Sequence, residues 1–259
     1  MINTKKIIRK YYIKFLRNRI KNPMVLQRLK MIYFSYQYFY LLGSNISKHR
    51  FKLFTSFIKI DFGILHAHQP IDFLLIAKRI INENNNGNEK GIIIEAGCWN
   101  GGSSAKLSLL TSLTGRTLQV YDSFEGVEPI GSEDDKSYDY SYEYSSSLEN
   151  TKANIQQYGR LDVCTFHKGY FEHSFVKYHT PFFLCYLDCD LAKGTSEVIQ
   201  SILPFTLNTS YIFSQDYAIR TVKQLLDDNA FLNKETLPRN LKYAKTVYTH
   251  ELVEFEFKK

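Results

Sequence analysis

Acidic residues and glycines follow several apolar segments of this sequence, at the points where the predicted strands end. Carboxylates in such places can accept hydrogen bonds from a ribose, take up a proton or bind a hard cation. Because the carboxyl ends of parallel strands meet at one edge of a sheet, we expect these residues to converge in one crevice. In chain order they are Glu95, Asp122, Gly169, Asp188 with Asp190, and Gln215 with Asp216.

The first two of these positions predict a nucleoside-cofactor site. The apolar run 91–95 leads into Glu95-x-Gly97-x-x-x-Gly101-Gly102, a turn whose glycines let backbone approach a ligand closely. Asp122 ends the next predicted strand, where a carboxylate can accept hydrogen bonds from a ribose diol. Glycines also occur in strand-to-helix turns for purely steric reasons, so the prediction depends on Asp122 as well.

Strands and helices alternate through most of the chain, which predicts parallel β-α-β units in a doubly wound α/β sheet. Helices are expected at 71–82, 103–114, 151–158 and 195–203, and strands at 91–95, 116–122, 163–168, 181–187 and 210–214. The tail, 243–257, has the pattern of two further strands and carries no motif. The polar, tyrosine-rich segment 131–147 is expected to be a lid over the crevice or, alternatively, a disordered insertion.

Three sequence runs together resemble the macrocin O-methyltransferase (TylF/MycF-like) family. These are Glu95-Ala96-Gly97-Cys98-Trp99-Asn100-Gly101-Gly102-Ser103-Ser104, Tyr121-Asp122-Ser123-Phe124-Glu125-Gly126 and Leu187-Asp188-Cys189-Asp190. The family comprises class I sugar O-methyltransferases that use S-adenosylmethionine, and the likeness covers about residues 65–235. It implies a Rossmann-like, mostly parallel sheet of seven strands. It also implies a sugar hydroxyl as acceptor, in a glycan, a nucleotide sugar or a glycosylated natural product.

The resemblance assigns roles to particular residues. Asp122 would hold the ribose of the cofactor, and Asp190 would be the general base that takes the proton of the acceptor hydroxyl. For Trp99 and Phe124, ordinary packing is an equal alternative. The other cofactor-binding residues implied are Glu95, Gly97, Ser103, Ser123, Gly169 and Tyr170.

The resemblance also implies a magnesium ion next to the methyl donor. Its ligands would be Asp188 and an acidic pair after the following strand, but this chain has Gln215-Asp216 there. An amide offers a carbonyl oxygen without negative charge, so metal binding should be weaker or lost. The chain also has Leu191-Ala192-Lys193 where the family usually has a tyrosine after the second Asp, which puts acceptor choice in doubt.

Charge divides the chain into two parts. Of the 33 Lys and Arg residues, 14 lie in residues 1–60, which contain no Asp or Glu, and the other 199 residues carry a net charge of −7. We therefore expect a basic, aromatic helical arm over 1–60 and a methyltransferase domain over 61–259. The arm is expected to pack on its own domain or a dimer mate, or alternatively to contact an anionic membrane surface. Nucleic acid is the least favoured partner, and the exposed aromatic arm favours self-association.

Other features bear on location and on rival functions. The chain has four cysteines without a C-x-x-C pair, no apolar stretch long enough to cross a bilayer and no signal peptide. We therefore expect a cytoplasmic protein, whose arm would act at the inner face of the membrane. The Asp188-x-Asp190 pattern also occurs in metal-dependent glycosyltransferases, and the loss of a carboxylate at Gln215 raises the alternative of a non-catalytic binding protein. His66 and His68 have no evident third metal ligand and are expected to face solvent or cap a helix. His167, His173 and His179 lie around the Gly169 turn, and one of them is a candidate to line the acceptor pocket.

Overall fold

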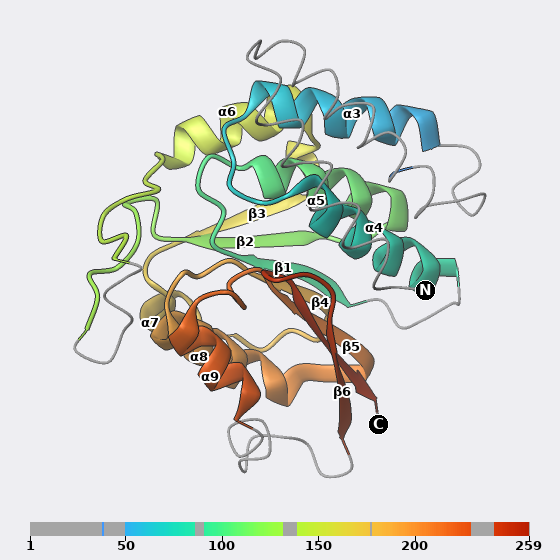
Figure 1. The fold of residues 1–259 in the computed structure, drawn as a ribbon. Coiled ribbons are helices and arrows are strands. Elements are labelled where there is room, and N and C mark those ends of the chain that lie inside the picture. Colours follow the sequence, from blue (N-terminus) through green and yellow to red (C-terminus); the bar gives the residue numbers. More distant parts are fainter. Residues whose placement is uncertain are drawn as a thin grey trace, which may run out of the picture.

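The computed structural model describes Tyr38 and residues 50–85, 91–131, 139–176, 178–228 and 241–258. Seven strands form one sheet in the order β3-β2-β1-β4-β5-β7-β6 (Figure 1). The strands are β1 (Ile92–Ala96), β2 (Leu118–Asp122), β3 (Cys164–Lys168), β4 (Phe182–Leu187), β5 (Thr206–Ser214), β6 (Lys242–Val247) and β7 (Val253–Lys258). Strands β1 to β5 pair in parallel, and β7 is antiparallel to both β5 and β6. The predicted doubly wound, mostly parallel sheet of seven strands is confirmed.

Helices cover both faces of the sheet, as Figure 1 shows. On one face lie α3 (Arg50–Gly63), α4 (Pro70–Asn85), α5 (Gly102–Thr114) and α6 (Leu148–Tyr158). On the other lie α7 (Phe171–Ser174), α8 (Ala192–Ile202) and α9 (Arg220–Asp227), of which α7 and α9 were not expected from the sequence. Two short 3-10 turns, η3 (Leu161–Val163) and η4 (Leu203–Phe205), precede β3 and β5. Each face therefore has its own apolar core, and β1 and β4 contribute residues to both.

Helix α3 crosses the domain boundary expected at residue 60. Its residues Leu53, Phe57 and Ile60 are buried in the same apolar core as residues of α4 and α5. The part of the arm from Arg50 onward therefore belongs to the body of the protein. Apart from Tyr38, which packs against Phe54, residues 1–49 lie outside the described residues. No helix in the described ranges is both long and apolar enough to cross a bilayer.

The strand register brings the expected site residues side by side. Ala96 pairs with Leu187, and Leu187 pairs with Ser214, so β1, β4 and β5 end at the same level. The backbone pairing then continues one residue further, because the amide of Asp188 donates to the carbonyl of Ala96 and the amide of Gln215 donates to that of Leu187, both at 2.9 Å. The segments that follow β1, β4 and β5 therefore begin next to one another at the same edge of the sheet.

Candidate active site

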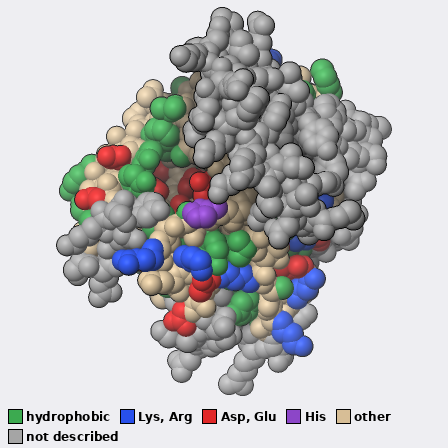
Figure 2. Space-filling view, in the orientation of Figure 1, with side chains coloured by type: hydrophobic (Ala, Val, Ile, Leu, Met, Phe, Trp, Pro, Cys, Tyr) green, Lys and Arg blue, Asp and Glu red, His purple; other side chains and the backbone are tan. Residues whose placement is uncertain are grey.

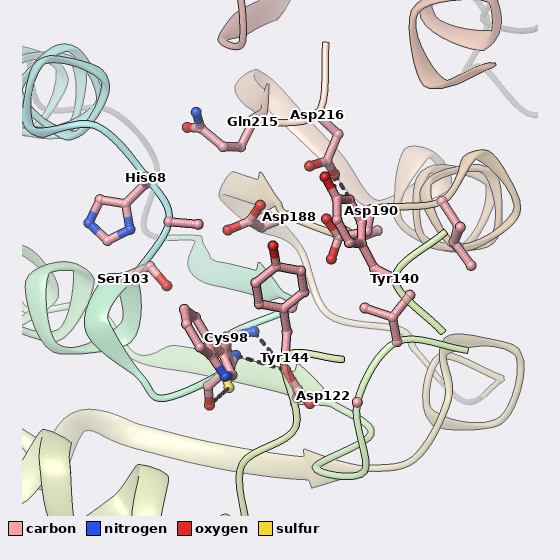
Figure 3. Close-up of a pocket in the computed structure, with 18 of the residues that line it drawn as sticks. His68, Cys98, Ser103, Asp122, Tyr140, Tyr144, Asp188, Asp190, Gln215 and Asp216 are labelled. Carbon is pink, nitrogen blue, oxygen red and sulfur yellow. Dashed lines mark hydrogen bonds between the residues drawn. The ribbon is translucent and has the colours of Figure 1, made fainter. Parts of the chain in front are cut away.

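A pocket of about 260 Å³ lies at this edge of the sheet. Figure 2 shows acidic side chains in a hollow of the surface, next to a histidine, and Figure 3 shows the residues in detail. Ten of the thirteen residues expected at the site line the pocket. They are Gly97, Trp99, Ser103, Asp122, Ser123, Tyr170, Asp188, Asp190, Gln215 and Asp216.

The other three expected residues do not line the pocket. Glu95 is completely buried below it, and Gly169, with a φ of 139°, makes the turn that leads to Tyr170. The side chain of Phe124 belongs to the apolar core, 6.5 Å from the ring of Phe166 between centroids. The side chain of Phe124 is thus packed in the core, as the packing alternative predicts. Trp99 does line the pocket.

Glycine is required at position 97 by the close approach of two loops. Gly97 has a φ of 88°, and a Cβ atom there would lie 1.9 Å from the carbonyl oxygen of Asp188. No side chain fits such a space. The glycine thus lets the turn after β1 contact the turn after β4, which brings the expected cofactor turn next to the expected metal ligands.

The Asp122 carboxylate organises the glycine-rich turn. Its Oδ2 accepts hydrogen bonds from the amides of Cys98, at 2.7 Å, and Trp99, at 3.2 Å, and its Oδ1 accepts one from the amide of Phe124, at 2.7 Å. An ionised carboxylate has about four acceptor positions, so capacity for a further donor remains. Asp122 therefore holds the turn and also faces the pocket.

Three carboxylates, those of Asp188, Asp190 and Asp216, form what we call the acid cluster (Figure 3). Oδ2 of Asp216 accepts hydrogen bonds from the amides of Cys189, at 2.7 Å, and Asp190, at 3.0 Å. Burial raises the pKa of Asp190 to about 8, with the charge of Asp188 adding to the shift, and it also raises the pKa of Asp216 to about 8. The pKa of Asp188 lies well above its ordinary value because of burial and the charge of Asp216. The cluster therefore favours a neighbouring cation or proton.

Gln215 lies between the acid cluster and two further carboxylates. Its Nε2 donates to Asp72 Oδ2 at 3.1 Å and to Glu251 Oε2 at 3.4 Å. Its Oε1 accepts from the hydroxyl of Tyr186 at 3.4 Å. The amide nitrogen is thereby directed toward the acids, which leaves the carbonyl oxygen as the atom able to bind a cation.

Aromatic side chains form another wall of the pocket. Trp99 and Tyr144 lie edge to face with their ring centroids 5.0 Å apart, and Tyr140 packs on Tyr144 at 5.2 Å. Both tyrosines come from the segment 131–147, of which residues 132–138 lie outside the described part. Ser141 forms a β-bridge with Val127, which holds this part of the segment beside the pocket. The sequence indicated a lid here but not which tyrosines face the site.

The histidines differ from expectation. His68 is 5% exposed and lines the pocket together with His66, so neither a solvent-facing nor a capping role is correct for it. Of the other candidates, His167 of β3 bonds to Gln119 of β2, and none of His167, His173 and His179 is among the residues that line the pocket. Glu251, in the turn between β6 and β7, also lines it, although the tail carries no sequence motif.

Comparison with known proteins identifies the family. The family model described as macrocin-O-methyltransferase (TylF) matches residues 74–247. The chain belongs to this family. A Streptomyces olivaceus enzyme, 8-demethyl-8-(2,3-dimethoxy-alpha-L-rhamnosyl)-tetracenomycin-C 4'-O-methyltransferase, is 27% identical over 149 residues, which are 53% of this chain and 57% of that protein. The match thus spans little more than half the length of this relative.

Two solved methyltransferases have a fold similar to that of this chain over most of its length. The O-methyltransferase NovP matches with a TM-score of 0.64 at 18% identity, over 89% of this chain and all of NovP. The calicheamicin methyltransferase CalS11 matches with a TM-score of 0.53 at 16% identity, over 92% of this chain and 95% of CalS11. These likenesses establish a Rossmann-like class I methyltransferase fold, and the family assignment is evidence against the glycosyltransferase alternative.

Proposed function

We propose that the protein transfers a methyl group from S-adenosylmethionine to a hydroxyl of a sugar. The observation that carries this proposal is the meeting, in one pocket, of the Gly97 turn with Asp122 on one side and the acid cluster on the other. The first arrangement suits a nucleoside and the second suits proton abstraction next to it. Family membership supports the reaction, and the rhamnosyl group in the name of the Streptomyces relative supports a sugar acceptor.

The residues of the first arrangement fit S-adenosylmethionine. Asp122 would hold the ribose, Gly97 and Ser103 would lie along the amino-acid part, and Ser123 and the Gly169-Tyr170 turn would lie near the adenine. Buried Glu95 lies beneath the turn, and a bound ammonium group would favour the ionised form of its carboxyl group, whose pKa burial raises to about 8. When bound, this cofactor supplies a methyl group on a positively charged sulfur, ready for attack by an oxygen.

The donor set near the acid cluster fits a magnesium ion. Asp188, Asp216 and the Oε1 atom of Gln215 are oxygen ligands of the kind that hard cations prefer. Burial and neighbouring carboxylates raise the pKa of Asp188 and Asp216, so a bound cation would stabilise their ionised forms. When bound, the ion would lower the pKa of an acceptor hydroxyl. Because Gln215 adds no charge, we expect weak binding.

Asp190 is the residue proposed to remove the proton. A general base works best when its pKa lies near the working pH, and the pKa of Asp190 is about 8. Asp190 has a φ of 61°, an uncommon conformation for a residue other than glycine, and its amide is held by Asp216 at 3.0 Å. Strain of this kind is found where a side chain must be directed at a substrate.

The direct test is methyl transfer itself. Purified protein is incubated with methyl-labelled S-adenosylmethionine, magnesium and a panel of rhamnosides, nucleotide sugars and glycan fragments, and the products are located by NMR. We expect one sugar hydroxyl to be methylated. Binding of the demethylated product S-adenosylhomocysteine without transfer to any acceptor would instead support the non-catalytic alternative.

Location and assembly are part of the same proposal. A cytoplasmic enzyme whose basic segment, residues 1–60, contacts the anionic inner face of the membrane would meet a lipid-linked acceptor there. Co-sedimentation of the full chain with vesicles containing anionic lipid tests this contact, with neutral vesicles as the control. Size-exclusion chromatography with light scattering tests the expected homo-oligomer.

A further inference from the structure

Lys106, on helix α5, is a lysine buried in the interior of the protein. It is completely buried, and its Nζ lies 2.7 Å from Nε2 of His68 and also bonds to a carboxylate oxygen of Asp61. The rings of Phe57 and Phe73 lie 5.7 and 5.2 Å away. Burial of a lysine is costly unless its charge is paired, so its partners indicate a specific role.

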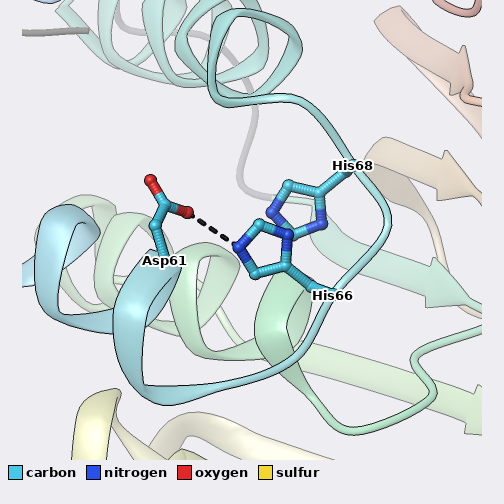
Figure 4. Close-up of side chains that lie close together, drawn as sticks. All are labelled: Asp61, His66 and His68. Carbon is cyan, nitrogen blue, oxygen red and sulfur yellow. Dashed lines mark ion pairs between the residues drawn. The ribbon is translucent and has the colours of Figure 1, made fainter. Parts of the chain in front are cut away.

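Two of these partners, Asp61 and His68, form with His66 a group that has the geometry of a metal site, but the Lys106 ammonium group already bonds to two of its three members. Asp61, His66 and His68 bring ligand atoms within 4.8 Å of one another (Figure 4). Oδ1 of Asp61 bonds to Lys106 and lies 2.9 Å from Nε2 of His66, while Nε2 of His68 faces Lys106. The ammonium group thus already supplies the positive charge.

Lys106 determines which nitrogen of His68 carries a proton. An ammonium group is a donor only, so Nε2 of His68 must accept. Burial and the charge of Lys106 hold the pKa of His68 well below its ordinary value, so the ring is neutral. The proton of a neutral ring is then on Nδ1. No hydrogen bond to Nδ1 of His68 is found within the described ranges, and the side chain lines the pocket.

His68 lies next to the first turn of α5, which is itself a region of positive potential. Gly102 and Ser103 line the pocket, and no side chain caps this 13-residue helix. Unpaired amides at the start of a helix attract anions. His66 packs on this turn, since a Cβ at Gly102 would lie 2.8 Å from the Cβ of His66, and it stacks on His68 at 4.0 Å. The helix start and the two histidines therefore form one wall of the pocket, across from the acid cluster.

We propose that His68 is a specificity residue that binds the carboxylate of the amino-acid part of the methyl donor, and that Lys106 is the positioning residue that fixes its tautomer. This inference rests on the proposed function, because that function supplies the ligand. The donor carries a carboxylate at one end and a cationic sulfur nearer the middle. Placing the carboxylate at His68 and the start of α5 leaves the cationic sulfur free to face the acid cluster, so the two charged walls of the pocket orient the donor.

The test compares two ligands that differ only in the carboxylate, S-adenosylhomocysteine and its decarboxylated form. Calorimetry measures their affinities for the wild-type protein and for His68→Phe, which keeps a ring but has no N–H. We expect the wild type to bind S-adenosylhomocysteine at least about tenfold more tightly than the decarboxylated form, because a hydrogen bond to a charged group contributes free energy of this size. In His68→Phe this preference should fall to about threefold or less, with the affinity for the decarboxylated form unchanged. An unchanged preference would overturn the proposal.

Further measurements separate this role from simple packing. His68→Asn keeps an N–H at the position of Nδ1 and should retain part of the preference, whereas Lys106→Met should lose it. The surface variant His173→Phe should behave as the wild type. In the wild-type protein, ¹⁵N NMR should show the His68 ring neutral with its proton on Nδ1, and a proton on Nε2 would overturn the proposal even if no variant folds. Failure of the wild type to bind either ligand would refute the proposed function itself.

Discussion

The side-chain amide of Gln215 donates from Nε2 to the buried carboxylate of Asp72 at 3.1 Å, joining the end of β5 to helix α4. A carboxylate at position 215 would instead lie against the charges of Asp72 and Glu251. The amide therefore reduces repulsion among the acids when no cation is present, at the expense of one charged ligand. This relationship explains how the chain can have an amide at a position where its family resemblance implies an acid.

Gln215→Asp should lower the stability of the protein and raise its affinity for magnesium. The added charge should lower the melting temperature in the absence of metal and tighten magnesium binding by about tenfold, because the affinity of hard cations rises with ligand charge. Calorimetry and thermal unfolding with and without magnesium measure both effects. Gln215→Ala, which removes the oxygen ligand without adding charge, is the matched control and should weaken magnesium binding. Equal magnesium affinity in all three proteins would show that residue 215 is not a ligand.

Asp190→Asn should abolish most of the turnover while leaving cofactor binding intact. Asparagine adopts the same left-handed backbone conformation readily, so the φ of 61° should persist. Loss of the general base should lower kcat by about 100-fold or more. Asp162→Asn, at an exposed position of η3, should have the activity of the wild type. Full turnover of Asp190→Asn at saturating magnesium and donor would show that another group takes the proton.

Gly97→Ala should disrupt the site through sterics alone. Because the new methyl group would lie 1.9 Å from the Asp188 carbonyl oxygen, the turns after β1 and β4 must separate, and we expect a loss of stability of about 3 kcal/mol or more. The matched control is Gly115→Ala at the end of α5, where φ is also positive, at 66°, but no atom lies within 4 Å. That variant should lose only about 1 kcal/mol. Equal losses in chemical denaturation would contradict the close approach.

The buried carboxyl of Glu95 should make stability fall as pH rises. Burial raises its pKa to about 8, with the Ser103 and Ser104 hydroxyls opposing the shift, whereas the unfolded chain ionises near 4.5. Between these values the folded protein holds a proton that the unfolded chain has released, so this contribution is present at low pH and is lost toward pH 8. Glu95→Gln should remove a slope on the order of 1 kcal/mol per pH unit. Denaturation at several pH values measures it, and parallel curves for the two proteins would place the ionisation elsewhere.

The sheet and most of the site could be predicted because both follow from local sequence. The isoleucine-rich run of β1, the apolar run of β4 and the acids after them specify buried parallel strands and a shared edge. Asp122, Asp188 and Asp216 line the pocket for this reason. The domain boundary expected at residue 60 follows from charge composition, which does not depend on packing. Helix α3 crosses this boundary because Leu53, Phe57 and Ile60 are buried in the core.

Roles that depend on contacts between residues far apart in the sequence could not be predicted. The tautomer of His68 is set by Lys106, 38 positions later in the chain, and the orientation of Gln215 is set by Asp72, 143 positions earlier. Glu251 reaches the pocket only because β6 and β7 form a hairpin at the edge of the sheet. Lys106 is the one feature of the sequence that points to this cluster, because it is a charged residue among the apolar and small residues on the buried face of α5.

Calorimetric titration of the purified protein with S-adenosylhomocysteine, with and without magnesium, tests directly whether the pocket binds an adenosyl cofactor. We expect binding with a dissociation constant in the micromolar range. An increase in affinity when magnesium is present would indicate that the acid cluster binds the ion despite Gln215. No binding under either condition would show that this pocket does not hold an adenosyl cofactor.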